Sequence, residues 1–169
     1  MTLEAAVADP ASDRSVAADP LSDAFFMEQA IALAECAAHH DEVPVGALVV
    51  RDGAILAQGW NCPIATHDPT AHAEVQALRA AGQRIGNYRL PGCDLYVTLE
   101  PCPMCAGAIV HARLRRVIFG ARDPKAGACG SVFNLLPTDS RFNHHTACTG
   151  GMLAERCSAQ LKAFFRARR

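Results

Sequence analysis

The spacing of apolar and polar residues divides most of the chain into helices and strands. Apolar positions three and four residues apart begin at Ser22 and continue to about His39, which predicts an amphipathic helix. Two runs rich in β-branched and apolar residues follow within residues 46–60, on either side of Asp52-Gly53. Because this dipeptide favours a tight turn, the two runs predict a β-hairpin.

Beyond the hairpin the pattern alternates between helix and strand. The expected elements are a helix over 71–82 that ends near Gly82, a buried strand over 94–99, a helix over 103–114, a short strand over 115–121 and a final helix after Gly150-Gly151, with loops over 61–70, 83–93 and 122–143. Pro103 suits the first helical position, which makes Cys102 the N-cap residue of its helix. Two consecutive strand–helix–strand crossovers imply a partly parallel sheet with helices on its faces, hence an α/β domain.

Composition and charge refine this domain plan. A chain of 169 residues that is 50% hydrophobic suits one globular domain, which we place over 22–169. Residues 1–21 are rich in Ala, Asp, Ser and Pro and predict a disordered extension. The net charge of −1 excludes a strongly basic nucleic-acid-binding protein, but five bases and no acid follow Glu155. That basic end suits either phosphate binding or the negative end of a helix dipole.

Targeting features are missing from the sequence. No apolar run approaches the roughly 20 residues that a membrane-spanning helix needs. The first 20 residues have neither the basic start nor the apolar core of a secretory signal. We therefore expect a cytoplasmic protein without a membrane association, whose eight cysteines are reduced thiols.

One short motif carries candidate chemistry. The stretch "LEPCPMCAGAIV" sets Cys102 and Cys105 three residues apart, directly after the predicted buried strand. Such a pair can be half of a structural zinc site, a redox dithiol or half of a catalytic metal site. The sequence holds no second C-x-x-C to complete a structural site, and position alone does not exclude a redox pair. The motif "HAE", at His72 to Glu74, favours the catalytic site because it opens the preceding helix.

The two helices are expected to bring these residues together. Helices that begin at the carboxyl edge of one sheet place their first turns around a shared cleft, where α/β proteins bind ligands. The imidazole of His72 and the thiolates of Cys102 and Cys105 supply three ligands and leave the fourth tetrahedral position of zinc to water. Zinc lowers the pKa of that water from about 15.7 to about 7, and Glu74 is placed to move its protons.

These motifs resemble those of the zinc-dependent cytidine/deoxycytidylate deaminase superfamily, whose signature is matched by "HAEVQAL" and "PCPMC". Within it, the chain from about Ala24 onward is similar to bacterial tRNA-specific adenosine deaminases, in "EVPVGALVV", "NYRL", "GARD" and the terminal "FFRARR". The resemblance implies a three-layer α/β fold, with a mixed central sheet of about five strands and helices on both faces. It also implies a homodimer.

The resemblance further implies an activity. The bacterial tRNA-specific adenosine deaminases convert adenosine at the wobble position of the tRNA anticodon to inosine. By this similarity His72, Cys102 and Cys105 bind one zinc ion, zinc-activated hydroxide attacks C6 of the adenine, and Glu74 shuttles protons. A free nucleobase deaminase that acts on guanine or cytosine is the alternative enzyme. A non-catalytic zinc module or redox protein is a third possibility, in which Glu74 has no role.

The same similarity suggests substrate contacts. Asn61 matches a position that touches the nucleoside, although it also suits an ordinary turn, and Asp123 matches one beside the nucleotide backbone. Phe164 and Arg166, with their neighbours, offer aromatic surface and positive charge for an anticodon stem-loop. The alternative is that at least one phenylalanine packs on the core and the arginines only solubilise the end. We assign Glu100 a structural role, tying the strand end to backbone donors.

Overall fold

The computed structural model describes residues 20–137 and 139–169. Residues 1–19 of the expected disordered extension over 1–21 lie outside the described residues and stay a prediction, whereas Pro20 and Leu21 begin the first helix and correct its end. The helices are α1 (Pro20–His39), α2 (Pro63–Thr66), α3 (Ala73–Ile85), α4 (Pro103–His111) and α5 (Ala154–Arg166). The strands are β1 (Gly46–Arg51), β2 (Ala54–Trp60), β3 (Asp94–Leu99), β4 (Arg116–Ala121) and β5 (Ala147–Gly150).

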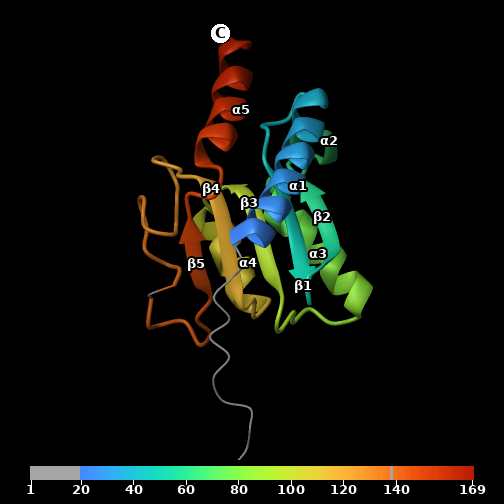
Figure 1. Ribbon diagram of the computed structural model, residues 1–169, viewed down its shortest axis with the longest axis vertical. Helices are drawn as coiled ribbons and strands as arrows, with labels where there is room; N and C mark the ends of the chain where they lie inside the picture. The colour runs from blue at the N-terminus through green and yellow to red at the C-terminus, as the bar shows by residue number, and fades with distance from the viewer. Residues whose placement is uncertain (1–19, 138) are drawn as a thin grey trace, which may run out of the picture.

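The five strands form one mixed sheet in the order β2-β1-β3-β4-β5 (Figure 1). Strand β1 runs antiparallel to both of its neighbours, whereas β3, β4 and β5 pair in parallel. The β1–β2 hairpin turns at Asp52-Gly53, where both residues have positive φ angles, 51° and 75°. Such angles belong to the tight turn that matches the twist of paired strands. The predicted hairpin and the partly parallel sheet are both confirmed.

Helices cover both faces of the sheet, which gives the expected three layers (Figure 1). Ala47 and Val49 of β1 point into a core shared with α3 and α4, whereas Leu48 and Val50 point into a core shared with α1 and the start of α5. Gly59 lets α3 lie directly on β2, since a Cβ atom there would come within 2.6 Å of the α3 backbone. This close contact fixes where α3 begins.

The direction of the strands places two helix starts at one edge of the sheet. Because β1 is antiparallel to both β2 and β3, those two strands point the same way. Helix α3 follows β2 after a loop, and α4 follows β3 after three residues. Both helices therefore begin at the carboxyl edge of the sheet, as the motif spacing predicted.

The structure differs from the sequence pattern in several places, among them the start of α1, which lies at Pro20 and not at Ser22. Helix α3 passes Gly82 and ends at Ile85, because Gly86 rather than Gly82 takes the left-handed cap conformation. Helix α4 ends at His111, before the expected 114. The expected loop over 61–70 contains the one-turn helix α2. Strand β5 is absent from the apolar pattern, because its sequence "ACTG" is short. Three of its residues are exposed and one is partly exposed.

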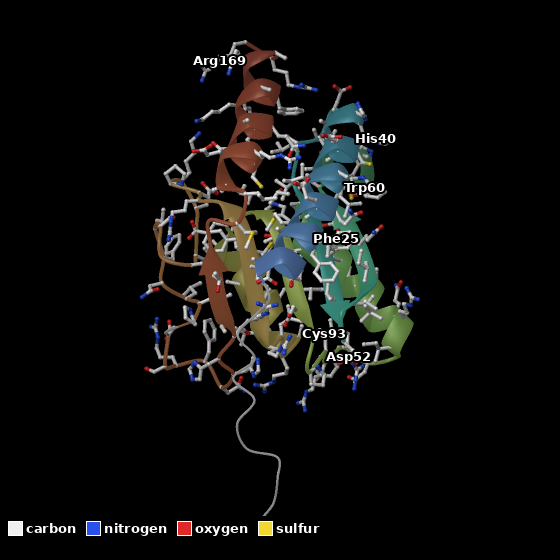
Figure 2. All side chains as sticks on the ribbon, in the orientation of Figure 1. Phe25, His40, Asp52, Trp60, Cys93 and Arg169 are labelled. Atoms are coloured by element: carbon white, nitrogen blue, oxygen red, sulfur yellow. The ribbon has the colours of Figure 1, made fainter. Side chains whose placement is uncertain are left out.

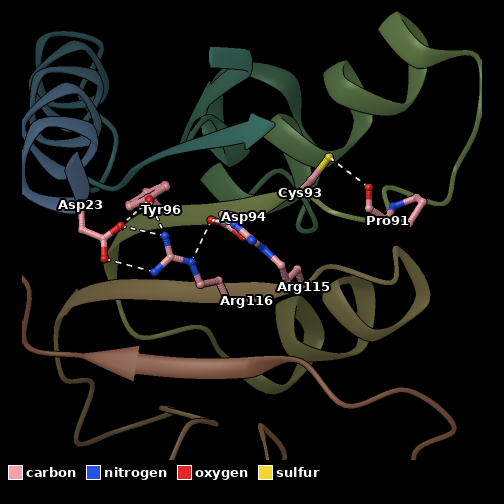
Figure 3. A network of polar contacts seen from close by, with 7 residues as sticks. All are labelled: Asp23, Pro91, Cys93, Asp94, Tyr96, Arg115 and Arg116. Carbon is pink, nitrogen blue, oxygen red and sulfur yellow. Dashed lines mark hydrogen bonds and ion pairs between the residues drawn. The ribbon is translucent and has the colours of Figure 1, made fainter. Parts of the chain in front are cut away.

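A network of polar and charged side chains joins α1 to the end of the sheet that lies opposite the carboxyl edge, where β3 and β4 begin (Figure 3). The Arg116 guanidinium donates to the buried carboxylates of Asp23 and Asp94, at 2.8 Å to each. The Tyr96 hydroxyl donates to Asp23 at 2.6 Å. Because both carboxylates are buried and paired, this network anchors α1 far from the carboxyl edge. None of the helices within the described residues has the length and apolar character that crossing a bilayer requires.

Candidate active site

The first turns of α3 and α4 bring three metal-binding side chains together. His72 and Cys102 are the N-cap residues of these helices, both with extended backbones, and Cys105 lies in the first turn of α4. The Nδ1 atom of His72 lies 3.7 Å from the Cys102 sulfur and 3.5 Å from the Cys105 sulfur. Tetrahedral zinc, with ligand distances of about 2.3 Å to sulfur and 2.0 Å to nitrogen, needs a separation of roughly 3.5 Å. The donor set and its spacing therefore fit zinc.

The protonation of these groups favours a cation as well. The hydrogen bond donated by the Cys105 thiol, more than any other cause, lowers the pKa of Cys102 to about 4. Cys105 keeps that proton, so its own pKa is raised. The hydrogen bond with Cys102 raises the pKa of His72. Metal ligation requires a thiolate, and the lowered pKa of Cys102 favours that form.

Glu74 lies in the first turn of α3, beside the three ligand atoms but not among them. Its side chain is buried and lies beside Cys105. Burial raises the pKa of Glu74 to about 7. A carboxyl group with such a pKa both accepts and releases protons at neutral pH.

Asn61 closes the loop that leads into α3. Its backbone N–H donates to the Val45 carbonyl at 3.0 Å, and its side-chain Oδ1 accepts from the Ala73 N–H at 3.1 Å. Asn61 thus supplies an acceptor for the first N–H group of α3, next to His72. Its side-chain NH₂ makes no hydrogen bond with other residues in the described part of the chain. This donor is therefore available to a ligand.

Glu100 organises the loop after β4, as the sequence-based interpretation expected. Its buried carboxylate accepts from the backbone N–H groups of Asp123, Cys129 and Ser131 at 3.0, 2.9 and 3.1 Å, and from the Ser131 hydroxyl. Gly127 leaves room for the carboxylate, since a Cβ atom there would lie within 2.6 Å of it. Glu100 therefore holds Asp123 beside the metal-binding turn.

A basic groove of about 740 Å³ runs from the carboxyl edge of the sheet along α5. Among the described residues that line it, six carry positive charge and Asp123 alone carries negative charge. The basic residues are Arg122, Lys125, Lys162, Arg166, Arg168 and Arg169. Figure 2 shows Arg169 at the far end of α5, opposite the Asp52 turn. Of the expected substrate contacts, Asp123 and Arg166 line this groove.

Phe164 corrects one expectation. Its ring is 9% exposed, packs beneath the Arg168 guanidinium at 3.6 Å and does not line the groove. The neighbouring Phe165 is 49% exposed and does line it. One phenylalanine therefore packs the helix and the other is free, because consecutive helical residues point to different sides. The amphipathic pattern of α5 could have identified Phe165 as the accessible ring.

Comparison with known proteins connects this geometry to a family. Residues 21–121 match the family model described as the cytidine and deoxycytidylate deaminase zinc-binding region. The chain belongs to this zinc-binding deaminase family. The match includes both helix starts that carry His72 and the cysteine pair, so the deaminase family and the His/Cys/Cys geometry agree on a zinc-dependent hydrolytic enzyme.

Individual relatives have names that are more specific than the description of the family. The chain is 51% identical over 148 residues to the tRNA-specific adenosine deaminase of Haemophilus influenzae, which covers 87% of this chain and 85% of the relative. A solved structure from work on A-to-I editing by tRNA:A34 deaminases at the wobble position matches with a TM-score of 0.78 and 43% identity, over 81% of this chain and 99% of that one. Guanine deaminase from Bacillus subtilis matches with a TM-score of 0.57 and 44% identity, over 63% of this chain and 68% of that one.

Proposed function

We propose that this deaminase converts adenosine to inosine at the wobble position of the tRNA anticodon, with release of ammonia. The relatives named for that activity align over most of both chains. The observation that carries the proposal is the basic groove, which lies at the same sheet edge as the His/Cys/Cys site. A free nucleobase needs only a closed pocket, whereas a nucleotide in an RNA loop needs its flanking phosphates and bases held.

The side chains of the site have different roles in the proposed reaction. His72, Cys102 and Cys105 would hold zinc, which when bound supplies a water molecule acidic enough to lose its proton near neutral pH. Glu74 accepts that proton, delivers it to the ring nitrogen of adenine and then assists the departure of ammonia. We propose that the NH₂ of Asn61, whose Oδ1 is engaged by the Ala73 N–H, donates to the nucleoside.

Guanine deamination is the second candidate, because the guanine deaminase structure shares 44% identity with this chain. That structure aligns over a smaller part of both chains than the tRNA deaminase structure does, and the groove formed by α5 favours RNA. The deciding experiment incubates zinc-loaded protein with an anticodon stem-loop that carries adenosine at the wobble position, and separately with free guanine and free cytosine. We expect inosine in the RNA and no ammonia from either base. Ammonia from a free base, with intact RNA, would reject the proposal.

The groove gives a direct prediction about RNA binding. Lys162→Ala combined with Arg166→Ala removes two exposed cations from the groove. Since each phosphate contact with single-stranded RNA contributes about 0.7 to the slope of log K against log salt concentration, we expect the slope to decrease by about 1.4. Binding of the stem-loop measured between 50 and 200 mM salt, on the order of physiological ionic strength, tests this.

The matched control for the groove is Arg51→Ala, which removes one exposed cation from the hairpin at the opposite end of the molecule. Its salt slope should equal that of the unmodified protein, and a decrease of about 0.7, the same per cation as in the groove variant, would show that binding does not depend on the groove in particular. These substitutions are cleaner than a deletion after Ala163, which also removes the buried Phe164 ring.

We also propose that the enzyme acts as a homodimer in the cytoplasm, where its tRNA substrate is found. The dimer is what the resemblance of the sequence motifs to the deaminases implies, and the location is inferred from the proposed tRNA substrate. Light scattering on the purified protein tests the dimer, with twice the 18.0 kDa chain mass as the expected result. Fractionation of cells tests the location.

A further inference from the structure

Glu42 is a buried carboxyl group outside the candidate active site. It is 1% exposed and follows the C-terminal end of α1. Its Oε1 atom accepts a hydrogen bond of 2.8 Å from the backbone N–H of Ala65, 23 residues further along the chain. Its Oε2 atom is also buried and has no partner among the residues described. Within the described residues, the Ala65 N–H is therefore the one hydrogen-bond partner of this buried side chain.

The backbone of Glu42 is held rigidly. Helix α1 ends with Asp41 in the left-handed conformation, at a φ angle of 61°. The Asp41 N–H then donates to the Ala38 carbonyl at 3.1 Å, and the Glu42 N–H donates to the Ala37 carbonyl at 3.0 Å. This pair of bonds is the Schellman arrangement, which fixes the chain direction after a helix. The Glu42 side chain therefore extends from a fixed point.

Its partner Ala65 lies in the segment that connects Asn61 to His72, which we call the 62–71 loop. The loop is closed at its base by the Cys62 N–H, which donates to the Ala71 carbonyl at 3.0 Å. Helix α2 lies inside this loop, and its N-cap residue Cys62 provides no side-chain hydrogen bond. Glu42 supplies the missing acceptor from outside the loop. A contact distant in sequence thus fixes the body of the loop.

We propose that Glu42 is a positioning residue for the deamination, which holds Asn61 in place by fixing the 62–71 loop through the Ala65 N–H. The inference rests on the proposed function, because it takes Asn61 as the contact with the nucleoside. Asn61 is also bound to the segment that contains Glu42, since its backbone N–H donates to the carbonyl of Val45, three residues after Glu42. Glu42 works through a hydrogen-bond acceptor at a fixed reach and not through its charge.

Three substitutions of Glu42 separate the effect of side-chain length from the effect of charge. Glu42→Gln keeps an acceptor oxygen at the same distance and removes the charge. Glu42→Asp keeps the charge but is one methylene too short to reach the Ala65 N–H, and Glu42→Ala loses both. Because a misplacement of about 1 Å at a reacting group can lower a rate by about 10²-fold, we expect kcat on the stem-loop to fall about 10- to 100-fold in the Asp and Ala variants. The Gln variant should keep kcat within about threefold of the unmodified enzyme.

Further readouts distinguish positioning from loss of structure. KM for the stem-loop should change less than about threefold in each variant, because the basic side chains of the groove, and not Glu42, supply most of the binding energy. Zinc content should remain one ion per chain. Amide hydrogen exchange of the 62–71 loop should increase in the Asp and Ala variants and not in the Gln variant. The control is Tyr96→Phe, which loses the bond to Asp23 at the opposite sheet edge and should lower stability without changing kcat.

The outcomes are decisive in each direction. An active Asp variant with an impaired Gln variant would show that charge matters, and would overturn the inference. So would an Ala variant with unchanged kcat, or one that loses zinc in proportion to its loss of activity. If the unmodified protein forms no inosine, the proposed function fails. Amide hydrogen exchange of the 62–71 loop in the zinc-loaded Asp and Gln variants still tests the link from Glu42 to the loop in that case.

Discussion

Replacing Glu74 with glutamine is expected to lower the deamination rate by at least about 10³-fold while the protein stays folded and keeps its zinc. Glutamine has the same shape as glutamate but cannot accept a proton and pass it on. General acid–base catalysis contributes on the order of 10²- to 10⁴-fold, and Glu74 serves more than one proton transfer in the proposed reaction. The buried position, which raises its pKa to about 7, suits both directions of transfer.

A measurement of zinc content and a control variant accompany the rate for Glu74→Gln. Zinc content by elemental analysis should equal that of the unmodified protein, because the Glu74 carboxyl is not among the three gathered ligand atoms. The matched control is His72→Ala, which should lose both zinc and activity. A Glu74→Gln enzyme with zinc bound and a rate within tenfold of the unmodified one would contradict the role of Glu74. A Glu74→Gln protein without zinc would show that Glu74 is itself a ligand.

The sequence predicted the parts of the fold that local chemistry determines. Asp52-Gly53 specifies its turn, and Pro103 places Cys102 at the N-cap of α4. Strand β3 over 94–99 is buried along most of its length and has the bounds that its apolar run indicates. In each case neighbouring residues supply the deciding interaction. The gathering of His72 with the cysteine pair also followed, since it needs only two helices that start at one sheet edge.

The parts that the pattern missed depend on distant partners. Strand β5 exists because it pairs with the edge of β4, and Gly150 lets it pass over the ring of Phe119. Helix α2 receives its acceptor from Glu42. Neither partner is visible in a short window of sequence. The resemblance to deaminases provided the fifth strand, which the apolar pattern alone did not.

Replacing Glu100 with alanine is the change expected to destabilise the protein most among those considered. Four hydrogen-bond donors from three residues, Asp123, Cys129 and Ser131, converge on its carboxylate. Because each buried donor left without an acceptor costs about 1–3 kcal/mol, and the loop relaxes in part, we expect the free energy of unfolding to fall by roughly 4 kcal/mol. For a chain of this size that corresponds to a decrease in Tm of about 10 °C.

Variants of intermediate strength test whether Glu100 acts through its acceptors. Ser131→Ala removes only the hydroxyl donor and should cost about 1 kcal/mol. Each carboxylate oxygen of Glu100 accepts from two donors, so Glu100→Gln keeps one acceptor oxygen but turns an NH₂ group toward two donors, and its stability should lie between those of the Ala variant and the unmodified protein. This contrasts with Glu42, where one acceptor suffices and glutamine should substitute well. Urea unfolding measures the series, and a Glu100→Gln protein as stable as the unmodified one would show that the loop does not depend on both carboxylate oxygens.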